Sequence, residues 1–389
     1  METATPIQQS ERNIIVDIIR GFALTGVLIA NFTSYNYQQI PTGVLDSISS
    51  PLDKTLIDFN TIFFEWKFMT LFSILFGYGF GLILTSLEKK NINPNAFFLR
   101  RMFWLFVIGL IHTSFWWADV LHLYAMGGVL LLLFRKLSTR NILVCSFVFM
   151  FILAPAVSFV TRNNADFFTD QNISVLYEQY KHGNLFNVFR ENWTFYYHAF
   201  IAFDFDVHDV IEALGRFLFG YYLLRIGLFD SVESKKKLFK RVVLVTAPIV
   251  IIYLISRWMV VEGKLDTSAY YWEPLKKLGI ICTSCCYASI LVIAFIAFGQ
   301  NRFFKSLQAL GKMTLTNYLM VSAFLIILLY GFGFGKLGEL PMHIIWMYAA
   351  AWLAFETIFS TWWLSKFRYG PVEWIWRQLT YQKRIQLRK

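Results

Sequence analysis

Charged residues are scarce in this sequence. Only 16% of its 389 residues are Asp, Glu, Lys or Arg, whereas soluble domains carry about 25%. The hydrophobic share is 57%, above the roughly 45–50% of soluble domains. Most hydrophobic residues lie in runs of about 17 to 25, the length of a helix that crosses a bilayer. The composition therefore excludes an ordinary soluble domain and predicts that lipid surrounds most of the chain.

Cysteine is also rare, and its positions argue against redox or metal chemistry. Cys145, Cys282, Cys285 and Cys286 all fall inside apolar runs. The C-x-x-C of Cys282 and Cys285 places two small side chains on one face of a helix. We therefore expect these cysteines to pack between helices, and we expect no metal site.

The net charge of +11 and the pI near 9.4 could indicate a nucleic-acid partner. That interpretation requires basic residues on one face of a soluble domain, whereas here they lie in short loops between apolar runs. We therefore expect the partners to be the lipid bilayer and small molecules, with no nucleic acid. The oligomeric state is left open.

The first apolar run, from about Ile14, has no small-residue cleavage site after it, so it is expected to be a retained helix.

The apolar runs predict an all-α, polytopic transmembrane bundle of about ten spans, forming a single domain over residues 1–389. The predicted spans are 14–31, 61–85, 102–117, 119–134, 141–160, 210–228, 241–261, 278–298, 313–331 and 343–364. Lys and Arg alternate between rich and poor loops, which places both termini in the cytoplasm. Within the second span, Ser73, Gly77 and Gly81 recur every four residues and predict a close helix contact.

Two segments outside the spans are expected to lie at the membrane interfaces. Residues 161–209 are too long for a bare loop and too polar for a span. Their aromatic residues favour a segment in the outer interface that acts as a lid over a cavity. Residues 366–389 are expected to form a cytoplasmic interfacial helix, starting at Pro371, followed by a basic tail.

Ionisable residues inside spans are costly, so they mark sites of pairing or function. On the cytoplasmic side, Asp17 and Arg20 stand at i, i+3 and could form a structural ion pair. Alternatively, Arg20 could bind phosphates together with Arg100 and Arg101, with Gly21 letting a ligand approach the backbone. The sequence leaves both interpretations open.

A second group lies toward the outer side. Its members are Asn31, Glu65, Lys67, His112, Asp119, His122, Glu212 and Arg216. The two spans that carry His112 and His122 are joined only by about Trp117 and Ala118, so the two imidazoles should lie close together. A histidine beside carboxylates can act as a general base or as a proton relay. The alternative is that these polar groups hold the helices together by hydrogen bonds.

Six motifs, spread over nearly the whole chain, resemble those of a known family. They are Arg12-Asn13 with Asp17, Arg20-Gly21-Phe22-Ala23 and Asn31; Lys67-Phe68 to Gly77; Arg100-Arg101 to His112; Asp119 to Ala125; Gly311 to Tyr318; and Tyr369 to Thr380. Together they resemble the YeiB-like family, which carries domain of unknown function 418. One departure is Ala118, where the family commonly has glycine.

The resemblance implies a multi-pass protein of the bacterial inner membrane whose activity is not established. The family is also similar, more distantly, to membrane acyltransferases that use cytoplasmic acyl-CoA to modify glycans or lipids on the far side. By that resemblance, Arg20 and Arg101 are candidates for binding the donor, and His112 or His122 is a candidate base.

The leading hypothesis is therefore an acyltransferase with acyl-CoA as donor substrate and an outer-face glycan, lipid or small molecule as acceptor. Asp119, Glu65 or Glu212 would orient the base, and Asn31, Lys67 and Arg216 are candidates for substrate binding. The rival hypotheses are a proton-coupled transporter or exporter, and a non-catalytic membrane component. A cavity leading from the cytoplasmic side to the histidine pair favours transfer, whereas a midplane cavity between inverted repeats favours transport.

Overall fold

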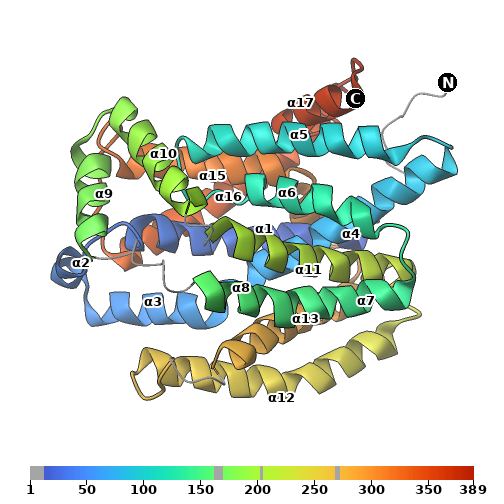
Figure 1. The fold of residues 1–389 in the computed structure, drawn as a ribbon, viewed down its shortest axis with the longest axis horizontal. Helices are drawn as coiled ribbons and strands as arrows, with labels where there is room; N and C mark the ends of the chain where they lie inside the picture. The colour runs from blue at the N-terminus through green and yellow to red at the C-terminus, as the bar shows by residue number, and fades with distance from the viewer. Residues whose placement is uncertain (1–12, 162–169, 202–204, 268–271) are drawn as a thin grey trace.

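A computed structural model describes residues 13–161, 170–201, 205–267 and 272–389 (Figure 1), and the described chain is predominantly helical. An isolated β-bridge between Phe367 and Arg388 is the β pairing found among these residues. The α-helices, in chain order, are α1 (Ile14–Tyr37), α2 (Thr42–Ile48), α3 (Pro51–Phe63), α4 (Lys67–Lys89), α5 (Pro94–Thr113), α6 (Leu121–Leu131), α7 (Thr139–Val148), α8 (Ala154–Thr161), α9 (Asp170–His182), α10 (Leu185–Ile201), α11 (Phe205–Arg225), α12 (Lys236–Val261), α13 (Trp272–Phe298), α14 (Arg302–Lys312), α15 (Thr314–Leu329), α16 (Met342–Lys366) and α17 (Pro371–Tyr381). The predicted all-α fold is confirmed.

Local sequence signals account for several helix ends. The side chain of Asn13 accepts a hydrogen bond from the backbone N–H of Ile15 and caps the start of α1. Pro371 occupies the first turn of α17, where its missing N–H costs no helical hydrogen bond. Pro155 cannot donate to the preceding turn, and the chain just before it forms a π-helical turn, η3 (Phe149–Leu153). The helix predicted to begin at Pro371 is thus present.

Seven helical segments among the described residues are long and apolar enough to cross a membrane. They are Ile14–Asn36, Pro51–Lys89, Pro94–Thr113, Thr139–Phe159, Lys236–Val261, Trp272–Phe298 and Met342–Lys366. An eighth is added if α14 and α15, which are bent by 81° relative to one another, are taken as one broken span.

The other predicted spans correspond to helices that do not meet this criterion alone. The span predicted at 119–134 is α6 with a short 3₁₀ turn, η2 (Leu132–Phe134), and the span at 210–228 lies in the more polar α11. The span at 313–331 is α15, and the amphipathic α14 before it was not expected. The helix α5 ends at Thr113, four residues before the predicted end at 117.

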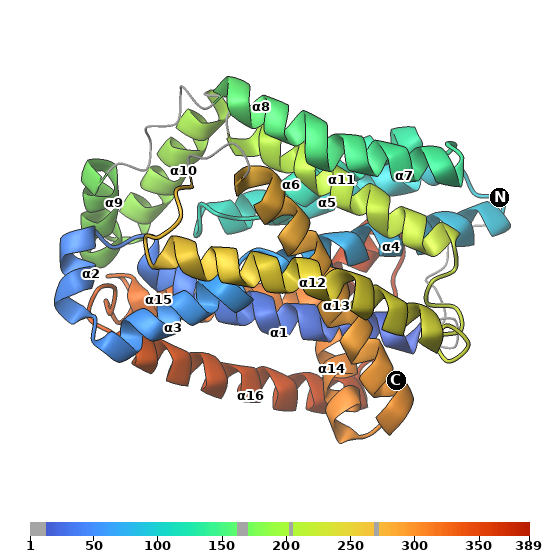
Figure 2. The same ribbon diagram turned by 90° about the horizontal axis from the view of Figure 1, so that it is seen from below.

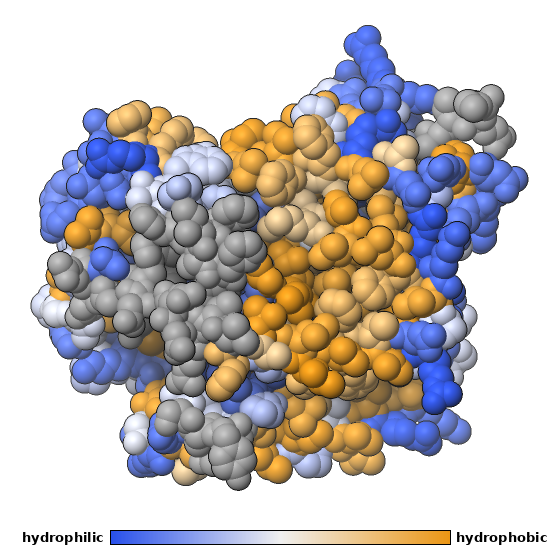
Figure 3. All heavy atoms as spheres, in the orientation of Figure 1, coloured by the Kyte–Doolittle hydropathy of each residue, from blue (hydrophilic) through white to orange (hydrophobic). Residues whose placement is uncertain are grey.

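The long helices run roughly along one direction, so the bundle has two distinct ends (Figures 1 and 2). The start of α1, the end of α4, the start of α5 and α17 lie at one end, which we call the basic end because it carries Lys89, Lys90, Arg100 and Arg101. The helices α2, α9 and α10 lie at the opposite end, which we call the far end. A broad apolar band separates two hydrophilic ends on the face drawn in Figure 3. This pattern is expected of a protein whose middle faces hydrocarbon.

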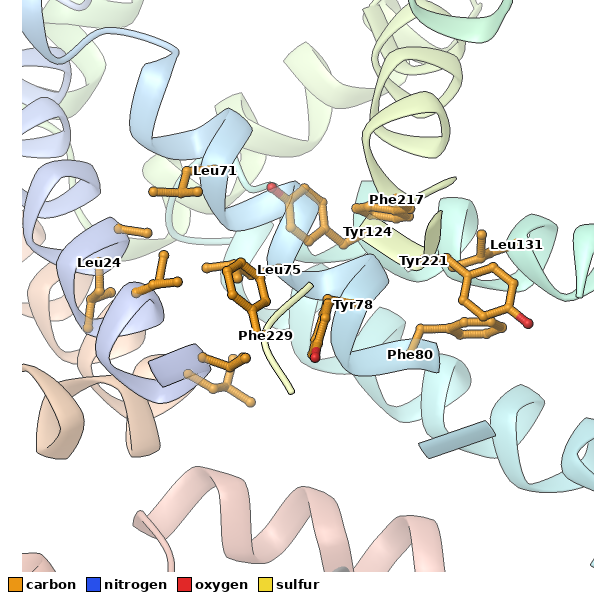
Figure 4. Packing of buried hydrophobic residues seen from close by; sticks show 14 of the residues in the cluster. Leu24, Leu71, Leu75, Tyr78, Phe80, Tyr124, Leu131, Phe217, Tyr221 and Phe229 are labelled. Carbon is orange, nitrogen blue, oxygen red and sulfur yellow. The ribbon is translucent and has the colours of Figure 1, made fainter. Parts of the chain in front are cut away.

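The main hydrophobic core joins α1, α4, α6 and α11 (Figure 4), and its buried residues include Leu24, Leu75, Tyr124 and Phe217. A glycine allows α4 and α11 to approach closely. A Cβ on Gly77 of α4 would lie 2.0 Å from the carbonyl oxygen of Phe217, so the contact predicted from the Ser73-Gly77-Gly81 spacing is confirmed.

Within the segment 161–209, residues 170–201 contain α9 and α10, residues 205–209 begin α11, and residues 162–169 and 202–204 lie outside the described residues. In α10, Asn192 donates to the carbonyl of Ser114 at 2.9 Å, and the indole N–H of Trp193 donates to the Ser114 hydroxyl at 3.1 Å. Tyr180 of α9 stacks on Tyr330, which follows α15. The segment therefore covers the connection between α5 and α6 at the far end.

Candidate functional site

A cavity of about 890 Å³ lies inside the bundle and is lined by α1, α4, α5, α6, α11, α14, α15, α17 and their connections; we call it the central cavity. On α1 its lining residues recur every three or four positions from Val16 to Asn31. They therefore occupy one face of the helix over about 22 Å, at 1.5 Å per residue. The central cavity thus extends along most of a hydrocarbon core about 30 Å thick.

The two ends of the central cavity differ in charge. Seven cationic side chains and three carboxylates contribute to the lining, which gives an excess of positive charge. The cations are Arg20, Lys89, Lys90, Arg101, Arg225, Lys312 and Arg377, and the carboxylates are Asp17, Asp230 and Glu373. All ten belong to the basic end by their position on the helices. The middle is walled by Leu, Val, Met and Phe side chains, so an amphipathic molecule with an anionic head matches the lining.

Helix α17 closes the central cavity at the basic end. The Arg101 guanidinium carbon lies 3.6 Å from the centre of the Trp376 ring, and the Trp376 indole donates to the Arg101 carbonyl at 3.0 Å. Glu373 accepts hydrogen bonds from the backbone N–H groups of Leu315 and Thr316 at 2.7 and 3.0 Å. Burial raises the pKa of Glu373, and the hydrogen bonds from Thr316 and Leu315 partly oppose that rise. The carboxyl group thus caps the start of α15 and fixes α17 to it.

The candidate donor residues have different surroundings. Arg20 lines the central cavity and also pairs with Asp17 at 3.3 Å, so both interpretations of this pair are compatible with the geometry. Arg101 lines the cavity as well. Arg100 instead donates to the Thr380 carbonyl at 2.5 Å and to the Gln382 side chain at 2.7 Å, which fastens the end of α17.

Gly21 has a packing role that differs from the one suggested by the sequence. A Cβ at Gly21 would lie 1.9 Å from the carbonyl oxygen of Leu307 in α14, and one at Gly311 would lie 1.8 Å from the carbonyl oxygen of Asp17. The missing side chain of Gly21 therefore allows α1 and α14 to touch. The expectation that Gly21 lets a ligand approach the backbone is wrong on this face, which the backbone of α14 fills.

His112 and His122 bind the same carboxylate at the far end. His112 Nδ1 lies 2.7 Å from Asp119 Oδ1, and His122 Nδ1 lies 2.8 Å from Asp119 Oδ2. The backbone N–H of His122 also donates to Asp119 at 3.0 Å. All three side chains are buried. The predicted proximity of the two imidazoles is confirmed, and we call this group the His–Asp–His cluster.

The His–Asp–His cluster lies directly behind the wall of the central cavity. Trp116, Ala118, Val120 and Leu121, which flank Asp119 in the chain, line the cavity, as does Asn31 of α1. The Nε2 atom of His112 has no hydrogen-bond partner among the described residues. If Asp119 is ionised, it fixes the His112 proton on Nδ1 and leaves a lone pair on Nε2, the form required of a general base.

The remaining outer candidates form separate groups. Glu212 pairs with Arg216 and with Lys277, the latter at 3.0 Å, and His208 lies 3.4 Å from the same carboxylate. This network ties α11 to α13, and none of its members is among the lining residues of the central cavity.

Glu65 and Lys67 also lie apart from the His–Asp–His cluster. Glu65 pairs with Arg257 of α12 at 2.6 Å. Lys67 is buried and donates to the carbonyl of Thr61 at 2.8 Å. In the sequence analysis these two residues were grouped with the histidines because they lie toward the same side of the membrane. In the structure their partners are Arg257 and Thr61, and not the histidines.

Several residues of the central cavity were not assigned to it from the sequence. From the sequence, Lys312 and Tyr318 were placed in the Gly311–Tyr318 motif and Glu373, Trp376 and Arg377 in the Tyr369–Thr380 motif, and none of them was assigned to a binding site. The Gly311–Tyr318 and Tyr369–Thr380 motifs were the signal that could have found them. Among the described residues, no group of three or more His, Cys, Asp or Glu side chains could hold a metal ion.

The fold has the helix lengths and apolar surface of a multi-pass membrane protein. Residues 223–383 match the family model described as "Protein of unknown function (DUF418)". The chain is a YeiB-like protein of the DUF418 family, as the motifs in its sequence suggested.

Three bacterial relatives extend this similarity over nearly the whole chain. "Uncharacterized protein YxaH" of Bacillus subtilis (strain 168) is 25% identical over 405 residues, covering 98% of this chain and 97% of the relative. "Uncharacterized 39.9 kDa protein in amylase 3'region" of Bacillus acidopullulyticus is 26% identical, covering 98% and 97%. "Uncharacterized protein YeiB" of Escherichia coli (strain K12) is 26% identical, covering 95% and 96%. No solved structure gives a significant match.

Proposed function

We propose that this protein spans the bacterial inner membrane ten times and has both termini in the cytoplasm. In this arrangement α6, α11 and α15 cross in addition to the seven segments that are individually long and apolar enough. The basic end is cytoplasmic, because Lys and Arg are retained on that side. With 11 residues, α17 is about 16 Å long and lies at the interface instead of crossing.

Accessibility of single cysteines tests this topology. Cysteines introduced after Lys90, after Lys237 and at the C-terminus are expected to resist a membrane-impermeant maleimide applied to intact cells, whereas cysteines within 170–201 are expected to react. The native cysteines are replaced by serine first. Labelling of the C-terminal cysteine in intact cells would contradict the topology and the direction of transfer proposed below.

We propose further that the protein transfers an acyl group from a cytoplasmic acyl-CoA to a glycan or lipid acceptor at the outer face. The observation that carries this proposal is the central cavity, which extends from a cluster of cationic side chains to the wall of the His–Asp–His cluster. Guanidinium groups match phosphate oxygens, and the apolar walls suit the arm and acyl chain of the donor.

The chemistry requires a base at the far end. A histidine of the cluster takes the proton of the acceptor hydroxyl while its oxygen attacks the thioester carbonyl. The carbon–oxygen bond forms, the carbon–sulfur bond breaks, and the same histidine returns the proton to the departing thiolate. Asp119 fixes the tautomer and stabilises the imidazolium in between.

Donor binding tests the basic end of the central cavity. Purified protein in nanodiscs is titrated calorimetrically with acetyl-CoA, octanoyl-CoA and palmitoyl-CoA. We expect Arg20→Gln and Arg101→Gln each to weaken binding by about tenfold or more, the size expected for a lost hydrogen bond between charged groups. Arg302 is an exposed arginine at the start of α14, so Arg302→Gln is the matched control. This variant should bind acyl-CoA as tightly as wild type does.

The Arg20–Asp17 pair needs one further variant. If this ion pair is purely structural, Arg20→Gln strands a buried carboxylate and lowers the folding yield, whereas Asp17→Asn/Arg20→Gln restores the yield and binds the donor normally. If Arg20 holds phosphate, the double variant folds but still binds weakly. Well-folded wild type that binds none of the three donors would refute the acyltransferase proposal and favour proton-coupled transport.

A further inference from the structure

Helix α12 lies along the lower edge of the bundle in Figure 1 and in front of it in Figure 2. Its buried side chains are Phe239, Val250 and Tyr253. Their spacing places all three on one side of the helix, because successive residues turn by about 100°. This side packs against α13, where Gly279 leaves room for the Tyr253 ring. The opposite side of α12 therefore faces away from the bundle.

The outward side of α12 begins with three cations. Lys237, Lys240 and Arg241 lie in the first two turns of the helix and are exposed. Lys237 is three residues from Lys240 and four from Arg241, so their like charges repel one another. Within the described part of the chain, none of the three side chains has an ion-pair or hydrogen-bond partner. The charge of this group, which we call the α12 cations, is therefore not balanced by the protein.

The same side of the helix continues as an apolar surface. Leu244, Ile251 and Ile255 follow at helical spacing and are 75%, 57% and 53% exposed. From Leu244 to Ile255 the helix rises by about 16 Å, which is about half of a hydrocarbon core roughly 30 Å thick. The apolar surface is thus about as deep as one leaflet of a bilayer, and the α12 cations lie at the level of the headgroups of that leaflet.

The topology of the chain explains only part of this arrangement. Orientation depends on how many Lys and Arg residues a loop and its neighbouring helix ends carry, so cations on any side of α12 would serve it equally well. Their position above an outward apolar surface needs another reason. Long cationic side chains can lie along apolar surface with their charge at the headgroups, where anionic lipids attract them.

We propose that α12 binds an anionic phospholipid of the cytoplasmic leaflet. Its negatively charged headgroup lies on Lys237, Lys240 and Arg241, and one of its acyl chains lies along the surface from Leu244 to Ile255. The lipid site goes beyond the acyl transfer proposed above and does not depend on it. The proposed topology serves only to name the leaflet.

Quenching by brominated lipids tests this preference directly. The four native cysteines are replaced by serine, and Val245→Cys, beside the apolar surface, carries a bimane fluorophore. The protein is placed in nanodiscs of dioleoylphosphatidylcholine that contain equal fractions of either dibrominated phosphatidylglycerol or dibrominated phosphatidylcholine. We expect the apparent binding constant of phosphatidylglycerol to be about threefold or more above that of phosphatidylcholine. Equal quenching by the two lipids would overturn the proposal.

Two double variants separate the α12 cations from the general charge of the basic end. Lys237→Gln/Arg241→Gln should bring the ratio of the two binding constants close to one. Arg384→Gln/Arg388→Gln removes the same charge from exposed residues of the C-terminal tail and should keep the wild-type ratio. A preference that survives in the first variant, or that is lost equally in both, would mean that α12 does not hold the headgroup.

Salt gives a check that needs no substitution in the lipid site. Raising NaCl from about 0.1 M to about 1 M shortens the Debye length from about 10 Å to about 3 Å, so the ratio should fall toward one. A preference that does not respond to salt would overturn the role of the α12 cations. Both sides of a nanodisc carry the same lipids, so these results do not depend on the orientation of the chain or on turnover.

Discussion

Replacing His112 by glutamine is expected to lower turnover by about 10²- to 10⁴-fold, the usual contribution of a general base. Acyl-CoA binding should be unchanged, because the cationic side chains of the central cavity lie at the opposite end of the bundle from His112. Glutamine can still donate to Asp119, so the variant avoids a stranded buried carboxylate. Thiol release from acetyl-CoA gives the rate, and calorimetry gives the affinity.

His343→Gln is the control for this experiment. His343 Nδ1 lies 2.8 Å from Asp53 Oδ1, so it forms the same kind of pair at the start of α16, away from the central cavity. We expect this variant to keep wild-type turnover. If His112→Gln retained activity, or if both variants lost it equally, the base would have to be sought elsewhere.

The second large effect is expected from Gly311, where α14 touches α1. Gly311→Ala would place a Cβ 1.8 Å from the Asp17 carbonyl oxygen, and rigid backbone cannot yield as a flexible side chain does. We expect a loss of about 1–3 kcal/mol of stability, the usual cost of overpacking. A lower apparent Tm and a lower yield in detergent would report it.

Gly43→Ala in α2 is the matched substitution, because nothing lies within 4 Å of the added Cβ. It should change stability by less than about 0.5 kcal/mol, as surface substitutions usually do. A Gly311 variant as stable as the Gly43 variant would mean that α1 and α14 are not in close contact.

Most of the helical architecture could be predicted from the sequence, because hydropathy and loop charge report directly on burial in lipid. The break between α14 and α15 could not. Met313 interrupts the helix there, and the 81° bend depends on how α14 lies across α1. Such a crossing is set by tertiary contacts and leaves no periodic signal in the sequence.

The candidate site was only partly predictable for a related reason. Sequence position gives the depth of a residue in a bundle but not the direction in which its helix faces. The short α5–α6 connection fixed that direction for His112 and His122, so their proximity could be predicted. Nothing comparable constrained Glu65 or Glu212, which turned out to pair with Arg257 and with Arg216 and Lys277.

The hydrogen bonds that Glu373 accepts from the start of α15 make the closure of the central cavity depend on α17. The wall at the basic end includes Glu373, Trp376 and Arg377, and all three belong to this one short helix. A chain that lacked α17 would therefore keep the other helices and yet leave the central cavity open at its charged end.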